Sequence, residues 1–278
     1  MADQGASDGA GLSGRPLALI TGASAGLGAA FAAAYAARGH DLAIVARRAD
    51  RLQVLADRLT AEHGIEVLVI PADLSLFEAH IPVLEVIAAA GRVVDVLVNN
   101  AGFGIPQSFN TVPWARQRDF LMTLVVTVCG FAHGVIPGMV ARGRGSIINV
   151  ASLAAFSPGV AGNTLYPGAK GLVLKFSQAL DAEYRAKGLK VTAICPGFTT
   201  TEFAEQAGIQ QIMEREPRLL SQTPQAVVEI AIRANQRGRV VVVPGLHNKL
   251  AAFLMRRLPE ALVRAVIGAG SAKYHLEE

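Results

Sequence analysis

Tyr166 and Lys170 are the residues whose types and spacing most directly suggest chemistry. They stand four positions apart, so on a helix their side chains share one face. A phenol has an ordinary pKa of about 10, and an ammonium one turn away favours the phenolate. Ser152 adds a hydroxyl that both donates and accepts, and so can hold a substrate oxygen. Although a Tyr and a Lys at this spacing are common on protein surfaces, the three residues predict proton transfer at a carbonyl or alcohol oxygen.

A glycine-rich turn follows the first apolar run of the chain. The run LALIT leads into TGASAGLG, which opens an alanine-rich helical stretch. Glycines let the backbone approach a pyrophosphate, and the N-terminus of a helix offers free N–H donors. Three glycines alone are as often a plain loop, but the strand–turn–helix context predicts a dinucleotide site. The residues assigned to it are Gly22, Ser24, Ala25, Gly26, Leu27 and Gly28.

The end of the second apolar run indicates which dinucleotide binds. A carboxylate there would bond the adenosine ribose and repel a 2′-phosphate, yet the run ends with Arg47 and Arg48. Two guanidiniums suit a phosphate dianion through fork-shaped donation. The alternative is that Arg48 and Arg51 form a solvated helix face. We expect NADP(H) as the cofactor, with Arg47 or Arg48 as the main contact.

The elements that must position these residues alternate along the chain. Near-continuous Val, Ile and Leu runs predict strands buried on both faces, and the intervening patterns predict helices. The expected strands are 17–21, 41–46, 66–72, 94–100, 146–152, 190–196 and 240–244. The expected helices include one ending near residue 38, 49–63, 75–90, 112–142 and 163–187. The fold class predicted is α/β, a single doubly wound parallel sheet of about seven strands with helices on both faces.

The chain divides into a central domain with two extensions. Residues 1–15 are polar and Gly/Ser-rich and are expected to be a disordered tail, and 16–245 form the dinucleotide-binding catalytic domain. Residues 197–222 have weak periodicity and follow a strand, where an α/β sheet places its ligand, so they predict a substrate lid. Residues 246–278 predict two amphipathic helices split at Pro259. These helices are expected to pack on the domain or a partner subunit, with a membrane surface as the alternative.

Six motifs in this order resemble the short-chain dehydrogenase/reductase family from about residue 16 to 245. They are the glycine turn, Asp73-Leu74, Asn99-Asn100-Ala101-Gly102, Ser152, Tyr166 with Lys170, and Pro196-Gly197 with Thr199. The resemblance implies that Ser152, Tyr166 and Lys170 are catalytic and that Lys170 also bonds the nicotinamide ribose. It further implies cofactor contacts from Asp73, Leu74, Asn100, Ala101, Gly102, Tyr166, Lys170, Pro196, Gly197 and Thr199. A homodimer or homotetramer is implied in the same way.

Three positions depart from the family pattern. Leu124 stands where most members have an Asn that helps hold a water beside the catalytic Lys, although its main-chain carbonyl, Thr123 or Thr127 can substitute. Ser152 and Tyr166 are fourteen positions apart, one more than usual. Pro167 follows the tyrosine, which a helix tolerates only in its first turn or at a kink. These departures raise a second hypothesis, a dinucleotide-binding regulatory or scaffold protein with little catalysis, but the enzyme is preferred because Ser152, Tyr166 and Lys170 all remain.

Composition restricts the remaining function classes. The net charge is +4, but the cations are scattered among acids, so nucleic-acid binding is not expected. No run reaches the roughly 18 apolar residues of a membrane span, and the N-terminus lacks the apolar segment of a signal peptide. Cys129 and Cys195 are expected to be buried free thiols, and no metal site is expected. We expect a cytoplasmic protein that acts on a small, apolar carbonyl or alcohol.

Overall fold

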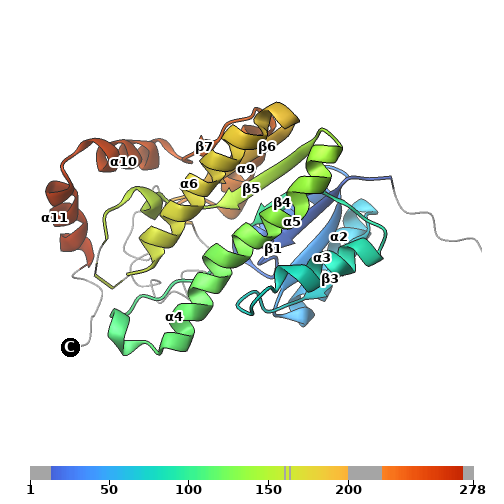
Figure 1. Ribbon diagram of the computed structural model, residues 1–278, viewed down its shortest axis with the longest axis horizontal. Helices are drawn as coiled ribbons and strands as arrows, with labels where there is room; N and C mark the ends of the chain where they lie inside the picture. The colour runs from blue at the N-terminus through green and yellow to red at the C-terminus, as the bar shows by residue number, and fades with distance from the viewer. Residues whose placement is uncertain (1–13, 160, 163, 200–220, 272–278) are drawn as a thin grey trace, which may run out of the picture.

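Seven parallel strands form one sheet in the order β3-β2-β1-β4-β5-β6-β7. The computed structural model describes residues 14–159, 161–162, 164–199 and 221–271 (Figure 1). Residues 1–13 of the predicted tail and most of the predicted lid therefore lie outside the described residues. The predicted doubly wound α/β fold is confirmed, since β1 lies between β2 and β4 and the chain crosses over in opposite directions from it.

The strands follow the apolar runs closely. Their bounds are β1 Leu17–Thr21, β2 Asp41–Ala46, β3 Val67–Pro71, β4 Val94–Asn99, β5 Gly145–Val150, β6 Leu189–Ile194 and β7 Val241–Val242. Every residue of β1 and β2 is buried, as expected for a sheet covered on both faces. β7 is shorter than the predicted run 240–244 because it is an edge strand that pairs with β6 over two residues.

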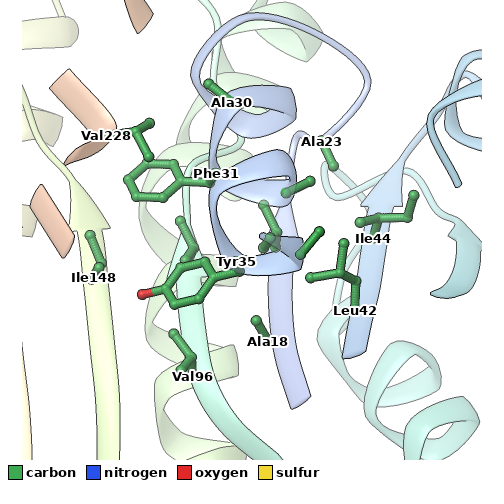
Figure 2. Close-up of a cluster of buried hydrophobic side chains, with 14 of the residues drawn as sticks. Ala18, Ala23, Ala30, Phe31, Tyr35, Leu42, Ile44, Val96, Ile148 and Val228 are labelled. Carbon is green, nitrogen blue, oxygen red and sulfur yellow. The ribbon is translucent and has the colours of Figure 1, made fainter. Parts of the chain in front are cut away.

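Helices cover both faces of the sheet. One face packs on α1 (Gly26–Ala36), α2 (Ala49–His63) and α9 (Pro224–Gln236). Figure 2 shows Phe31 of α1 pointing toward Val228 of α9, above the strands. The other face packs on α3 (His80–Ala89), α5 (Thr127–Ala141) and α6 (Tyr166–Tyr184). The two apolar clusters hold the carboxyl ends of the strands in fixed positions.

Two predicted helices differ from the observed ones. α3 begins at His80 rather than at 75, because Asp73 and Ser75 form a local turn and Glu78 has a φ of 55°. The predicted helix 112–142 contains α4 (Trp114–Leu121), the π-helical segment η2 (Met122–Val126) and α5. Together they form a helix of 28 residues that is long and apolar enough to cross a membrane, with half of its most apolar window buried in the domain. A buried core helix has the same composition.

Short helices and a C-terminal pair complete the described chain. The 3₁₀ segments are η1 (Phe109–Thr111), η3 (Leu153–Phe156) and η4 (Arg185–Lys187). The C-terminal helices α10 (Leu246–Arg257) and α11 (Glu260–Ser271) are separated at Pro259, as predicted. Figure 1 shows them at the end of the molecule opposite α2 and α3.

Candidate active site

The predicted site residues come together at the carboxyl edge of the sheet. The glycine turn follows β1, Arg47 and Arg48 follow β2, and Asn100 follows β4. Ser152 follows β5 and Pro196 follows β6. A doubly wound sheet opens a crevice beyond its strands where the crossovers change direction, here between β1 and β4. The site therefore has the location that this fold uses for dinucleotides.

The glycine turn is packed too closely for side chains. Gly22 has a φ of +68°, and a Cβ there would lie 2.8 Å from the Ala101 Cα. A Cβ on Gly28 would overlap the Gly22 carbonyl oxygen and lie 2.6 Å from Asn100 Nδ2. Only glycine fits either place without moving the backbone.

Asn100 and Thr21 hold this turn against the end of β4. Asn100 Nδ2 donates to the Thr21 carbonyl oxygen at 2.8 Å. The backbone N–H groups of Asn100 and Ala101 donate to Thr21 Oγ1 at 2.9 and 3.0 Å. The side chain of Asn100, predicted as a cofactor contact, thus supports the turn that would hold the cofactor. Thr21 was not among the predicted site residues, and its role depends on contacts that a sequence pattern does not show.

The N-terminus of α1 has the features of an anion site. The helix begins at Gly26 after Ala25, which makes no side-chain cap, and its first turn contains no acid. Its first N–H groups therefore remain available to an acceptor, and the helix dipole favours a negative one. The residues of the turn, including Ser24 and Leu27, fit a pyrophosphate.

The two arginines after β2 occupy different surroundings. Arg48 donates through Nε and Nη2 to Ser24 Oγ at 3.2 and 2.9 Å, so it is fixed beside the glycine turn. Arg47 is exposed. Burial raises the pKa of Asp73, but hydrogen bonds from Ser75 and the nearby charge of Arg47 bring that pKa below its ordinary value. The edge of the sheet beside the glycine turn thus carries the guanidinium groups of Arg47 and Arg48 near the carboxylate of Asp73.

The catalytic candidates meet at the start of α6. Tyr166 is the first residue of that helix, so Pro167 lies in its first turn, where no backbone N–H is needed. The side chain of Ser152 hydrogen-bonds to that of Tyr166, which shows that the extra residue between them is accommodated. Lys170 Nζ lies 5.7 Å from the centre of the Tyr166 ring and donates to the Val150 carbonyl oxygen at 2.7 Å.

Burial determines the acidity of both groups in this structure. It raises the pKa of Tyr166 to about 12, and the hydrogen bond from Ser152 only partly opposes that. It lowers the pKa of Lys170 to about 8. The expected lowering of the phenol pKa by the lysine is therefore not seen, because removal of the phenol from water dominates its pKa and the opposing effect comes from Ser152.

Cys195 lies next to these groups, and its thiol was assigned no chemistry. It is fully buried, burial raises its pKa to about 12, and it is close enough to Lys170 to interact with its charge. Both cysteines are free, as predicted, but Cys129 is only partly buried.

An apolar cluster surrounds Tyr166 and contains Leu124. Phe103, Phe120, Leu124 and Ala169 are its buried members, and the ring centres of Phe120 and Tyr166 are 6.4 Å apart. Leu124 is 1% exposed, lies in η2 and packs against Gly102. The two threonines proposed as substitutes are engaged elsewhere. Thr123 Oγ1 donates to the Asp119 carbonyl oxygen and Thr127 Oγ1 to that of Leu74, at 2.8 and 2.9 Å.

A small cleft opens beside the phenol. Its lining residues are Ile105, Gln107, Gln117, Phe120, Thr164, Leu165 and Tyr166. Gln117 is 3% exposed, and its amide donates to the Phe109 carbonyl oxygen at 3.3 Å. Of these residues only Tyr166 could be predicted from the sequence, because nothing in the local pattern of the others distinguishes them from core positions. They give the cleft an apolar wall with a few polar groups.

The turn after β6 is in contact with the C-terminal extension. The Leu153 N–H donates to the Pro196 carbonyl oxygen at 2.9 Å, which joins this turn to the segment after Ser152. Thr199 Oγ1 donates to the Gly197 carbonyl oxygen, and Thr199 pairs with Gln222. Asn248 of α10 is 5% exposed and lies so close to Gly197 that a Cβ there would overlap its Oδ1. Asn248 is therefore a neighbour of the site, and its sequence pattern gave no sign of this contact.

Comparison with known proteins gives consistent matches. A family model described as short chain dehydrogenase matches residues 16–212. The chain is 35% identical over 185 residues to an uncharacterized oxidoreductase of Myxococcus xanthus (strain DK1622), covering 66% of this chain and 72% of that one. It is 33% identical over 221 residues to the very-long-chain 3-oxoacyl-CoA reductase of Anas platyrhynchos, covering 77% and 67%.

Solved structures of other proteins have a similar fold. A short-chain dehydrogenase from Sphingobium yanoikuyae in complex with NADPH has a TM-score of 0.76 and 32% identity, over 88% of this chain and 97% of that one. The L-sorbose reductase of Gluconobacter frateurii, complexed with NADPH and L-sorbose, has a TM-score of 0.73 and 26% identity, over 88% and 98%.

Proposed function

The chain belongs to the short-chain dehydrogenase family, and from this premise we propose an NADP(H)-dependent oxidoreductase that interconverts a carbonyl and an alcohol. The observation that carries the proposal is the hydrogen-bonded pair of Ser152 and Tyr166, with the buried amine of Lys170 beside the phenol ring. A hydroxyl and a phenol that already contact each other can both bond one substrate oxygen. This pair suits proton transfer at that oxygen.

The proposed mechanism divides the reaction between protein and cofactor. The glycine turn, with Arg47 and Arg48, would hold NADP(H), which would supply or accept the hydride at the substrate carbon. In the reductive direction Tyr166 gives its proton to the carbonyl oxygen, and in oxidation it takes the proton back. Ser152 donates a hydrogen bond to the same oxygen and so stabilises the charge that develops on it. Since the pKa of Tyr166 is about 12, the phenol stays protonated at neutral pH and is ready to act as the acid.

Lys170 positions this pair. Its bond to the Val150 carbonyl oxygen at 2.7 Å holds the amine under the phenol, at the end of the strand that leads to Ser152. When protonated it favours the phenolate that forms as the proton leaves. With a pKa of about 8 it keeps that proton over the neutral range.

The charge after β2 supports NADP(H) over NAD(H). Arg48 is held beside Ser24 at the glycine turn, and Arg47 is exposed at the same edge. A 2′-phosphate of the adenosine ribose would be bonded by such guanidiniums. Two of the similar solved structures are described as complexes with NADPH.

An apolar ketone is the substrate class that we propose. Ile105, Phe120 and Leu165 line the cleft beside Tyr166, and the buried amide of Gln117 provides a polar contact within it. Among similar proteins, one is described as a 3-oxoacyl-CoA reductase and another as an alcohol dehydrogenase specific for bulky-bulky ketones, 30% identical to this chain. Both descriptions concern large ketones. We also propose that the enzyme is cytoplasmic and works as a homodimer or homotetramer.

A panel of ketones and aldehydes with NADPH, followed by cofactor absorbance, tests the proposed function. Steady NADPH consumption with at least one carbonyl is expected, and Tyr166→Phe should reduce it by about a hundredfold or more because the proton donor is lost. Binding of NADPH to this variant should stay close to that of the wild type. Turnover that survives in Tyr166→Phe would overturn the assignment.

A second candidate function is a dinucleotide-binding regulatory or scaffold protein with weak catalysis. Leu124 favours it, since an apolar side chain fills the place where family members usually carry an Asn. Tight NADPH binding without turnover over a broad carbonyl panel would support this function instead.

A further inference from the structure

Large apolar side chains are exposed along both α10 and α11. On α10, Leu246, Leu250, Phe253 and Leu254 are 82%, 60%, 57% and 40% exposed. Their spacing puts them on one helical face. The strip continues through Leu258, Leu262 and Val266, which are 39%, 50% and 69% exposed. We call these seven residues the C-terminal apolar strip.

The strip faces away from the domain. On α10 only Asn248 and Ala252 are buried, and on α11 Val263 is buried. The inner side of α10 contacts η3, with the Arg256 guanidinium 5.9 Å from the centre of the Phe156 ring. Of the expected packing on the domain or on a partner subunit, the structure shows the first for Asn248, Ala252 and Val263 but not for the strip, and packing on a partner subunit stays a prediction. Isolated exposed leucines are ordinary, but seven large apolar side chains exposed along two successive helices indicate an interaction surface.

Cations accompany the strip. Residues 246–271 contain Lys249, Arg256, Arg257 and Arg264 against a single carboxylate, Glu260, which gives a formal charge of +3. Glu260 is itself bonded to Arg264 at 2.8 Å. The Arg257 guanidinium lies 5.8 Å from the centre of the Phe253 ring. This cation therefore lies close to a side chain of the strip.

We propose that α10 and α11 dock the protein on an anionic lipid surface. The strip would enter the boundary between head groups and acyl chains, and the cations would lie among the lipid phosphates. The positive charge of residues 246–271 complements the negative charge of anionic lipids, and this favours a lipid surface as the partner. A second copy joined through the same strip would bring together two C-terminal segments that each carry a formal charge of +3, which opposes that pairing. The proposal does not depend on the redox activity, because its readout is lipid binding alone.

Co-sedimentation of the full-length protein with vesicles tests the docking surface. The wild type should sediment with vesicles of phosphatidylcholine mixed with phosphatidylglycerol and stay in solution with phosphatidylcholine alone. Leu250→Glu combined with Phe253→Glu should lower the bound fraction at least about tenfold, since two charges would enter the apolar boundary. The matched control is Val54→Glu with Phe77→Glu, which adds the same charge at side chains 71% and 77% exposed elsewhere, and it should bind as the wild type does.

A second variant tests the contribution of the cations separately from that of the apolar side chains. It also controls for the possibility that the strip variant misfolds. Lys249→Gln with Arg257→Gln leaves the strip intact and should weaken binding to anionic vesicles. Raising the salt from about 0.1 M to about 1 M should do the same to the wild type, because screening shortens from about 10 Å to about 3 Å. The proposal is overturned if the wild type ignores anionic vesicles, or if strip and control variants bind equally. It is also overturned if the strip variant only splits an oligomer, which would mean that a second copy covers the strip.

Discussion

Burial acts on Tyr166 and Lys170 in opposite directions and leaves both in their protonated forms near neutral pH. The phenol pKa rises to about 12 and the amine pKa falls to about 8, since each group is removed from water in its charged state. A buried ammonium is costly to the fold, and its bond to the Val150 carbonyl oxygen offsets only part of that cost. Lys170 should therefore destabilise the protein while serving the site.

Replacing Lys170 by methionine tests this trade-off. Lys170→Met should raise the free energy of unfolding by about 2 kcal/mol at pH 7, because it removes a charge buried at 6% exposure. The direction in which this difference changes with pH follows from the number of protons that the folded and unfolded states bind. Between the folded pKa of about 8 and the unfolded value of 10.5, the unfolded wild type binds more protons, so wild-type stability rises with pH. The advantage of the variant should shrink from pH 7 to pH 10 in urea unfolding.

Lys175 supplies the control for that measurement. It lies on the same helix as Lys170 but is exposed. Lys175→Met should change stability little, and by the same amount at both pH values. A Lys170→Met variant that is no more stable than the wild type at pH 7 would show that the buried lysine does not destabilise the fold.

Replacing Leu124 tests whether the lack of the family's Asn at this position interrupts proton transfer from Lys170 to water. Leu124→Asn should lower the free energy of unfolding by about 2 kcal/mol, because an amide would replace an apolar side chain that is 1% exposed among Phe103, Phe120 and Ala169. If leucine interrupts a proton path, the variant should nevertheless speed the proton-dependent step of turnover. The pH–rate profile decides the second point, since an unchanged profile would remove the relay interpretation.

At the residue scale, the sequence predicted those site residues that lie close to one another along the chain. Tyr166, Lys170 and the glycine turn could be assigned because helix and turn geometry bring them together locally. Gln117 and Thr21 could not, since their roles depend on the cleft wall and on bonds from β4 to β1. The rise of the phenol pKa was missed for the same reason, as burial by Phe120 and Leu165 is a tertiary property.

The element scale shows how helix α10 takes part in the site. Asn248 is held by its Nδ2 bond to the Pro244 carbonyl oxygen at 2.9 Å, and its Oδ1 occupies the space that a Cβ on Gly197 would need. The C-terminal extension and the turn after β6 are therefore fitted to each other. A sequence pattern can place each of them, but not the contact between them.

A double-mutant cycle measures this contact. Gly197→Ala should cost about 1–3 kcal/mol of stability in the wild type, through overlap with Asn248, and much less in an Asn248→Ala background. Asn248→Ala alone should cost about 1 kcal/mol for the buried hydrogen bond. Gly159→Ala is the control, because a Cβ there meets nothing within 4 Å. Additive costs for Gly197 and Asn248 would show that the two elements are independent.

Helix boundaries were predictable where local signals are strong. α2 spans Ala49–His63 as expected, since Gly64 adopts the left-handed conformation that ends a helix. The π-helical segment η2 was not predicted, because its residues continue the apolar pattern of an α-helix and only tertiary packing shifts the bonding. Such segments are frequent at functional sites, and η2 contains Leu124.

For the whole molecule, the strand order explains why distant residues form one site. β1 pairs with β2 on one side and β4 on the other, so loops at residues 22, 47 and 100 share the crevice. This arrangement was predictable, because parallel strands joined by helices obey strict connection rules. The position of α10 and α11 was not predictable, since amphipathic helices fit several surfaces equally well.

Cofactor binding across this crevice should stabilise the entire fold, and that stabilisation tests cofactor choice. A ligand at a hundred times its Kd adds about 2.7 kcal/mol to the free energy of unfolding, and each tenfold loss of affinity removes about 1.4 kcal/mol. NADPH should stabilise the wild type more than NADH does at equal concentration. Arg47→Ala with Arg48→Ala should reduce the NADPH effect by at least about 1.4 kcal/mol and leave that of NADH nearly unchanged, since both guanidiniums lie where the 2′-phosphate is expected. Arg58→Ala removes a charge from the exposed side of α2 and should change neither effect. Equal losses for the two cofactors in the double variant would mean that the arginines support the glycine turn through Ser24 rather than select a phosphate.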